Sequence, residues 1–126
     1  MTVNAIMLVD DEKINNVIHK KIVKQVIPDI IVLDYTNPVD ALEYLLTEQM
    51  PVPEVIFLDI YMPEMYAWEF LDRLKESTIN PDVYICSGSE TLIDNEKVAN
   101  YPSIKGLLHK PFGVETVKRI LTNQIF

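Results

Sequence analysis

Residues 5–11 read Ala5-Ile6-Met7-Leu8-Val9-Asp10-Asp11, five apolar residues that end on two adjacent carboxylates. A run that is apolar at every position is typical of a strand buried on both faces, as in a parallel sheet covered by helices. Similar runs follow at residues 30–33, 55–58, 83–86 and 106–108. The sequence therefore predicts five parallel strands.

The segments between these runs place apolar residues at the spacing of an amphipathic helix. These residues are Ile14, Val17, Ile18, Ile22 and Val26, then Ala41, Leu42, Leu45 and Leu46, then Phe70, Leu71 and Leu74, and finally Val114, Val117, Ile120 and Leu121. Residues 91–101 give the weakest helix, because only Val98 and Ala99 supply an apolar face. We predict an α/β fold, a doubly wound (βα)5 domain over residues 1–126 in three α/β/α layers, with no output domain.

The composition limits the classes of function. With 48% hydrophobic and 24% charged residues, the chain is typical of a globular protein. A net charge of −8 with no stripe of Lys or Arg argues against direct nucleic-acid binding. The apolar runs are too short to span a membrane. The single cysteine, Cys86, lies inside an apolar run, where we expect it to pack in the core, and a chain without a disulfide suits the cytoplasm.

Polar side chains follow four of the predicted strands. Asp10 and Asp11 follow the first, Asp59 follows the third, Ser87 follows the fourth, and Lys110 comes just after the fifth. The carboxyl ends of parallel strands share one edge of a sheet, where open α/β sheets bind ligands. We therefore expect three carboxylates, a hydroxyl and an ammonium group to meet in one crevice.

This set of groups suits phosphoryl chemistry. Clustered carboxylates repel one another unless a cation lies among them, and hard oxygen ligands favour Mg²⁺. A carboxylate at the end of a strand, such as Asp59, is held firmly enough to act as a nucleophile toward phosphorus. Lys110 and Ser87 are suited to contacting the oxygens of a phosphoryl group.

Three motifs carry a family resemblance. They are Leu-Val-Asp-Asp-Glu at residues 8–12, Leu-Asp-Ile-Tyr-Met-Pro-Glu-Met at residues 58–65, and Lys-Pro-Phe at residues 110–112, with Ser87 before the last. Their order over the whole chain resembles the receiver domain of bacterial two-component response regulators, the CheY-like family, which has a flavodoxin-like fold. Residues 66–71 and 100–102 also resemble the stand-alone, single-domain type.

The resemblance implies that Asp59 accepts a phosphoryl group from a sensor histidine kinase or a phosphotransfer protein. It also implies that Asp11 and Asp59 bind Mg²⁺ by their side chains and Tyr61 by its backbone carbonyl, while Asp10 acts largely through water. Ser87 and Lys110 would contact the phosphoryl oxygens. Such a domain is a signalling protein rather than an enzyme with a separate substrate.

The resemblance has further implications for geometry and partners. The Lys110-Pro111 bond is expected to be cis. The signal would pass to an unidentified downstream protein, or to a phosphorylation-linked dimer, through the face spanned by residues 91–126. Donor specificity would lie along the first helix, where Lys20, Lys21 and Lys24 make the surface basic.

The chain departs from the family pattern at several positions. Tyr66-Ala67 replaces an Asp-Gly or Asn-Gly pair, so a left-handed backbone position must be reshaped or tolerated. Leu107 replaces the aromatic switch residue, and we expect it in the core, with Tyr84 or Tyr101 as substitutes. Bulky Tyr61 and Ser89 flank the expected path of the hydrolytic water, which suggests slow dephosphorylation.

Other interpretations stay open from the sequence. The main one is a phosphorylation-silent receiver that acts only as a protein-binding module. An aspartyl-phosphate phosphatase is opposed by Tyr61, which stands where such enzymes carry a second carboxylate. A nucleotide-binding flavodoxin-like protein is opposed by the lack of a glycine-rich loop after the first strand. His19 is a candidate phosphohistidine, but we expect it on the exposed, lysine-rich face of its helix.

Overall fold

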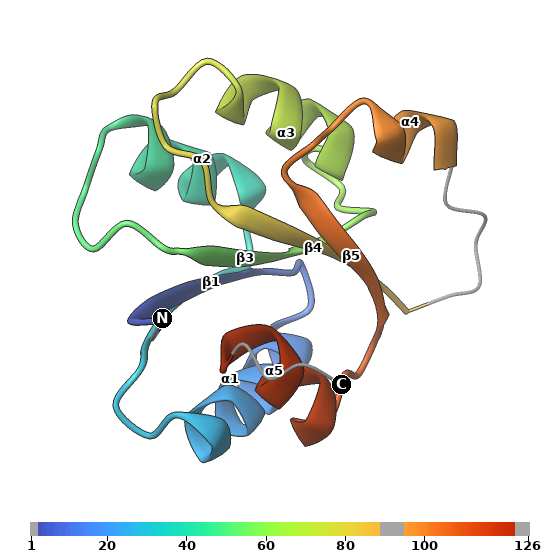
Figure 1. Ribbon diagram of the computed structural model, residues 1–126. Coiled ribbons are helices and arrows are strands. Elements are labelled where there is room, and N and C mark those ends of the chain that lie inside the picture. The colour runs from blue at the N-terminus through green and yellow to red at the C-terminus, as the bar shows by residue number, and fades with distance from the viewer. Residues whose placement is uncertain (1–2, 89–94, 123–126) are drawn as a thin grey trace.

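The computed structural model describes residues 3–88 and 95–122, which form a three-layer α/β/α sandwich (Figure 1). One parallel sheet has the strand order β2-β1-β3-β4-β5. The strands are β1 Ala5–Val9, β2 Ile31–Tyr35, β3 Val55–Asp59, β4 Asp82–Ser87 and β5 Ile104–His109. The helices are α1 Lys13–Val26, α2 Pro38–Leu46, α3 Ala67–Leu74, α4 Asn95–Ala99 and α5 Val114–Leu121. The predicted fold class is confirmed.

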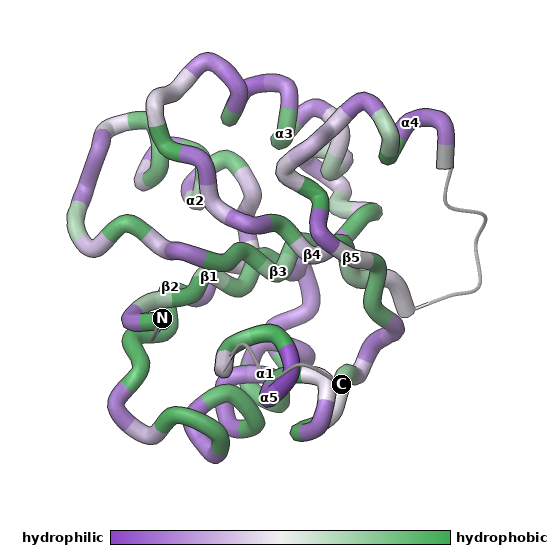
Figure 2. Tube along the Cα trace, viewed as in Figure 1, coloured by the Kyte–Doolittle hydropathy of each residue, from purple (hydrophilic) through white to green (hydrophobic). Residues whose placement is uncertain are grey.

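The sheet separates two hydrophobic clusters. Side chains alternate along β1, so Met7 and Val9 pack beneath α2 and α3, whereas Ile6 and Leu8 pack against α1 and α5. Figure 1 shows α1 and α5 on one side of the sheet and α2, α3 and α4 on the other. In Figure 2 the strands are largely hydrophobic, and the layer formed by α3 and α4 is largely hydrophilic.

The edge strands differ from the prediction that every strand is buried on both faces. The central strands β1 and β3 are buried at every position. On β2, however, Ile31 is 47% exposed, and on β5 Leu107 is 41% exposed. The expectation that Leu107 belongs to the core is therefore wrong: β5 is an edge strand of the described sheet, and the face that carries Lys105, Leu107 and His109 is exposed.

The first helix is rotated from the phase that its apolar residues predict. The residues of α1 that are buried are Asn16, His19 and Val23, whereas Ile14, Val17 and Ile18 are exposed. The cause is a polar anchor: the Asn16 amide donates to the carbonyl oxygens of Tyr35, at 3.0 Å, and of Asp10, at 3.4 Å. Hydrogen bonds to the ends of β1 and β2 thus fix which face of α1 turns inward.

The helix ends mostly follow the sequence signals. The Asn37 side chain accepts a hydrogen bond from the Val39 amide at 2.8 Å, and Pro38 opens α2. At the start of α3, Tyr66 has φ −76° and ψ 157°, so this loop is reshaped without a left-handed residue. Of the helix predicted over residues 91–101, residues 95–99 form α4, whereas residues 91–94 lie outside the described residues, as does Ser89. No helix of the described chain is both long and apolar enough to cross a membrane.

Candidate functional site

The carboxyl edge of the sheet brings three carboxylates together. Strands β1 and β3 are neighbours with Val9 opposite Leu58, so the residues that follow or end them, Asp10 and Asp59, lie side by side. One side-chain oxygen from each of Asp10, Asp11 and Asp59 lies within 4.8 Å of the others. The sequence-based expectation of a shared acidic crevice agrees with this geometry.

Lys110 lies between two of these carboxylates. Its Nζ is 3.0 Å from Asp10 Oδ2 and 3.2 Å from Asp59 Oδ1. Burial alone would lower the pKa of Lys110, but its hydrogen bond to Asp10 and the charges of both carboxylates outweigh burial and raise it. The Lys110-Pro111 bond is cis, as expected. The ammonium group therefore stays charged within the site.

The backbone around Lys110 ties it to β4. The Lys110 amide donates to the Ser87 carbonyl oxygen at 2.9 Å. A Cβ placed on Gly88 would lie 3.4 Å from Lys110 Cε, so the lysine stem passes close beside this glycine. Ser87 itself is buried at the end of β4. The predicted hydroxyl and the predicted ammonium thus come from adjoining segments.

Asp10 is held by several donors. Its Oδ1 accepts from the Glu12 amide at 2.9 Å, and its Oδ2 accepts from Asn15 Nδ2 at 3.2 Å as well as from Lys110. Both oxygens are therefore engaged, and the orientation of this carboxylate is fixed. The sequence analysis did not identify Asn15, which sits on α1 only five residues after Asp10.

Asp59 is the most perturbed carboxyl group of the site. Burial, followed by the charge of Asp10, raises the pKa of Asp59 from 3.8 to about 7, although Lys110 acts in the opposite direction. A hydrogen bond that the protonated Asp59 carboxyl donates to the Asp11 carboxylate acts to raise the pKa as well. The site therefore holds more negative charge than Lys110 balances.

The donor set fits Mg²⁺. Three carboxylates face one ammonium group, which leaves an excess of negative charge that a divalent cation would neutralise. The donors are hard oxygens, and a bound cation would act to lower the pKa of Asp59 by offsetting the charge of Asp10.

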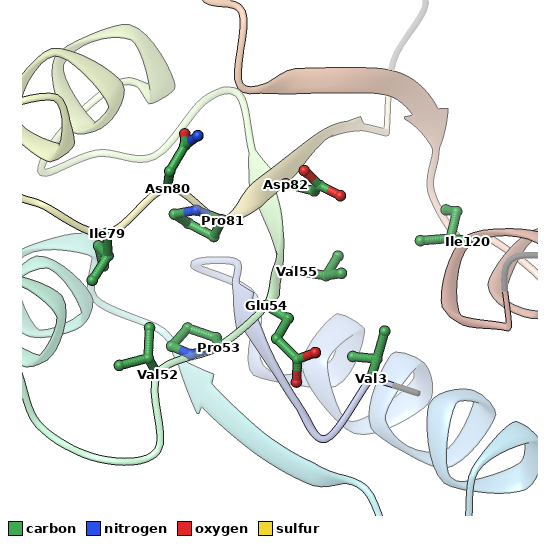
Figure 3. Close-up of a pocket in the computed structure, with 10 residues that line it drawn as sticks. All are labelled: Val3, Val52, Pro53, Glu54, Val55, Ile79, Asn80, Pro81, Asp82 and Ile120. Carbon is green, nitrogen blue, oxygen red and sulfur yellow. The ribbon is translucent and has the colours of Figure 1, made fainter. Parts of the chain in front are cut away.

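Tyr61 follows Asp59 by two residues, and its side chain lies at the surface. Its side chain is 43% exposed and meets Tyr66 edge to face, with ring centroids 5.5 Å apart. The hollow drawn in Figure 3 lies elsewhere: it is lined by residues at the amino ends of the strands, such as Val55 and Asp82, and has a volume of about 440 Å³. That hollow is at the opposite edge of the sheet and adds no group to the site.

His19 is buried, contrary to the expectation from the sequence. It was expected to be exposed, but it is 3% exposed and its ring stacks on Phe112 with centroids 3.8 Å apart. Burial lowers the pKa of His19 to about 4, with a smaller contribution from Lys110 and against the opposing effect of Asp10, so the imidazole is neutral near pH 7. The spacing of Asn16, His19 and Val23 could have indicated this inward face, but two of the three are polar.

The chain matches a known protein family. The family model described as "Response regulator receiver domain" matches residues 6–122. No curated protein matches the sequence of this chain.

Solved structures share the fold at low sequence identity. The crystal structure of a two component response regulator from Cytophaga hutchinsonii aligns with a TM-score of 0.81 and 21% identity, over 98% of this chain and 100% of that one. An uncharacterized protein from Neptuniibacter caesariensis aligns with a TM-score of 0.79 and 27% identity, over 95% and 85%. A response regulator receiver domain protein from Clostridium thermocellum aligns with a TM-score of 0.78 and 23% identity, over 96% and 93%.

Proposed function

The chain belongs to the response regulator receiver domain family, and from this membership we propose that it signals by accepting a phosphoryl group on Asp59. The donor is a sensor histidine kinase or a phosphotransfer protein. The observation that carries the proposal is the surroundings of Asp59, a strand-end carboxylate that lies 3.2 Å from Lys110 Nζ and beside two further carboxylates.

The chemistry assigns separate roles to the clustered groups. A carboxylate oxygen of Asp59 attacks the donor phosphorus in line with the bond that breaks. With a phosphohistidine donor, the P–N bond breaks and the histidine nitrogen keeps its electron pair. Lys110 is placed to offset charge on the transferred phosphoryl oxygens, and the Ser87 hydroxyl to donate a hydrogen bond to one of them.

We assign the metal to the carboxylate cluster. The side chains of Asp11 and Asp59 and the backbone carbonyl of Tyr61 would hold Mg²⁺, with Asp10 acting largely through water because both its oxygens are already engaged. Bound Mg²⁺ supplies charge neutralisation for the incoming phosphoryl oxygens.

A phosphorylation assay tests the proposal. The wild-type protein is incubated with Mg²⁺ and acetyl phosphate, and its intact mass is measured. We expect a gain of one phosphoryl group that hydroxylamine removes and that is lost in Asp59→Asn. Asp29→Asn, at an exposed turn, is the matched control and should be labelled like the wild type. Absence of label with acetyl phosphate and with a competent donor kinase would instead favour the phosphorylation-silent binding module.

The outer surface of α1 suits a protein donor. Ile14, Val17 and Ile18 are exposed on this helix. Val17 also lines a groove of about 560 Å³, together with Lys20, Lys21 and Lys24. Apolar contacts with a basic rim favour a donor surface that combines apolar and acidic side chains. Ile18→Asp should slow phosphorylation by the protein donor and leave phosphorylation by acetyl phosphate unchanged. Equal slowing with both donors would place the donor surface elsewhere.

The signal would leave the domain by protein contact. We propose that the domain acts in the bacterial cytoplasm and that its downstream protein, or a second copy, binds the face of α4, β5 and α5. Exposed Leu107 on β5 belongs to this face and is available to a partner. A pull-down with phosphorylated and unphosphorylated protein tests this, since only the phosphorylated form should retain the partner.

A further inference from the structure

Two buried polar atoms behind the carboxylate cluster lack partners. Among the described residues, His19 Nε2 and Asn16 Oδ1 have no hydrogen bond, although His19 is 3% and Asn16 2% exposed. Burying a polar atom without a partner costs free energy, so such an atom in a native protein calls for a reason. An apolar residue at position 19 would avoid that cost altogether.

A small cavity adjoins both residues. It has a volume of about 10 Å³, close to the space that one water molecule needs. Its lining includes His19 and Asn16 from α1 and also Asp10 and Asp59 from the site. A water there would find several polar partners, as buried waters require.

The ring of His19 is also connected to the segments that carry the site. It stacks on Phe112, which follows Lys110 by two residues, with centroids 3.8 Å apart and planes 10° apart. Phe112 stacks in turn on Phe57, two residues before Asp59, at 4.9 Å. His19 therefore packs directly on the loop that holds Lys110, and through Phe112 on the strand that ends in Asp59.

We propose that His19 and Asn16 hold one buried water behind Asp10 and Asp59, and that His19 is a positioning residue for the carboxylate cluster. The neutral imidazole donates its Nε2 proton to the water, and the water donates one proton to Asn16 Oδ1 and the other to the carboxylates that line the cavity. The His19 ring holds the Lys110 loop in place through its stack on Phe112, and Nε2 holds the carboxylates in place through the water. The role in positioning rests on the proposed function; the water site does not.

Two substitutions at position 19 separate the ring from the nitrogen. His19→Phe keeps the stack on Phe112 and removes Nε2, whereas His19→Gln keeps a side-chain N–H and removes the ring. We expect His19→Phe to fold and unfold like the wild type but to bind Mg²⁺ about tenfold more weakly, the usual loss when an outer hydrogen bond to a metal ligand is removed. His19→Gln should be less stable than His19→Phe and yet bind Mg²⁺ more tightly.

Calorimetric Mg²⁺ titrations and urea unfolding of both variants provide the test, with Val23→Ala as the control. Val23 lies on the same buried face of α1 but does not line the cavity, so this variant should lose stability and keep its Mg²⁺ affinity. If Mg²⁺ affinity instead follows stability across the series, or if His19→Phe binds Mg²⁺ like the wild type, His19 only packs and the proposal is wrong.

A high-resolution crystal structure tests the water directly. The wild type should show a water within about 3.2 Å of both His19 Nε2 and Asn16 Oδ1, and His19→Phe should lack it. A dry cavity, or a protein partner on Nε2, would overturn the proposal. Neither readout requires phosphorylation, so an unlabelled Asp59 in the wild type would refute the proposed function while leaving this result standing.

Discussion

Replacing Asp59 with asparagine removes a buried carboxyl group whose pKa the fold raises from 3.8 to about 7. Burial is the main cause, and the neighbouring Asp10 charge is the second. In the unfolded chain the group titrates near its ordinary value. Between about pH 4 and about pH 7 the folded protein therefore holds a proton that the unfolded chain has lost, and stability falls as the pH rises.

The size of the effect follows from the shift. Each unit of pKa shift corresponds to about 1.4 kcal/mol, so above pH 7 the ionisation of Asp59 lowers the free energy of unfolding by at most about 4 kcal/mol. Asparagine also gives up the ion pair with Lys110, which offsets part of the gain. In the absence of Mg²⁺ we expect Asp59→Asn to be about 2 kcal/mol more stable than the wild type near pH 8 and nearly equal to it near pH 4.

Urea unfolding of both proteins at several pH values, without divalent cations, measures this difference. Asp29→Asn at an exposed turn is the control and should stay within about 0.5 kcal/mol of the wild type throughout. A difference in the free energy of unfolding that is absent near pH 8, or that does not change with pH, would refute the account of Asp59 as a carboxylate that burial and the charge of Asp10 destabilise.

Three further predictions concern the same structure. Mg²⁺ at a hundred times its dissociation constant should raise the free energy of unfolding by about 2.7 kcal/mol, seen as a higher urea midpoint, and Asp59→Asn should lose most of this gain. Lys110→Met should lower the free energy of unfolding near pH 8 by about 3 kcal/mol, because Asp10 and Asp59 then face each other without a counter-charge. The loss should be smaller near pH 5, where Asp59 holds its proton. An equal loss at the two pH values would argue against the charge explanation. Tyr101→Phe removes the 2.8 Å hydrogen bond from the tyrosine hydroxyl to Asp72 and should cost about 1 kcal/mol by thermal unfolding, a loss that should be absent when Asp72 is already replaced by alanine.

The sequence was sufficient to predict the five strands and the convergence of the charged groups. Unbroken apolar runs such as residues 55–58 indicate buried strands, and parallel strands bring their carboxyl ends to one edge. Asp10, Asp59 and Lys110 could therefore be placed together before their distances were known.

The orientation of α1, the exposure of Leu107 on β5 and the burial of His19 could not be predicted in the same way. Hydrophobic spacing assigns Ile14 and Ile18 to the core, but the hydrogen bonds of Asn16 to two strand-end carbonyls turn that face outward. Leu107 is exposed because β5 is an edge strand, and strand order is a tertiary property that an apolar run does not report. The burial of His19 was not predicted because a polar residue on a helix is usually solvated.

The most direct measurement of the central claim is to locate the phosphoryl group. The phosphorylated protein is reduced with borohydride, which converts an aspartyl phosphate to homoserine, and its peptides are sequenced by mass spectrometry. Homoserine at position 59, with Asp10 and Asp11 unchanged, is the predicted result. Modification at another carboxylate or at His19, or no homoserine in a sample that carries phosphate, would contradict the assignment of Asp59 as the acceptor.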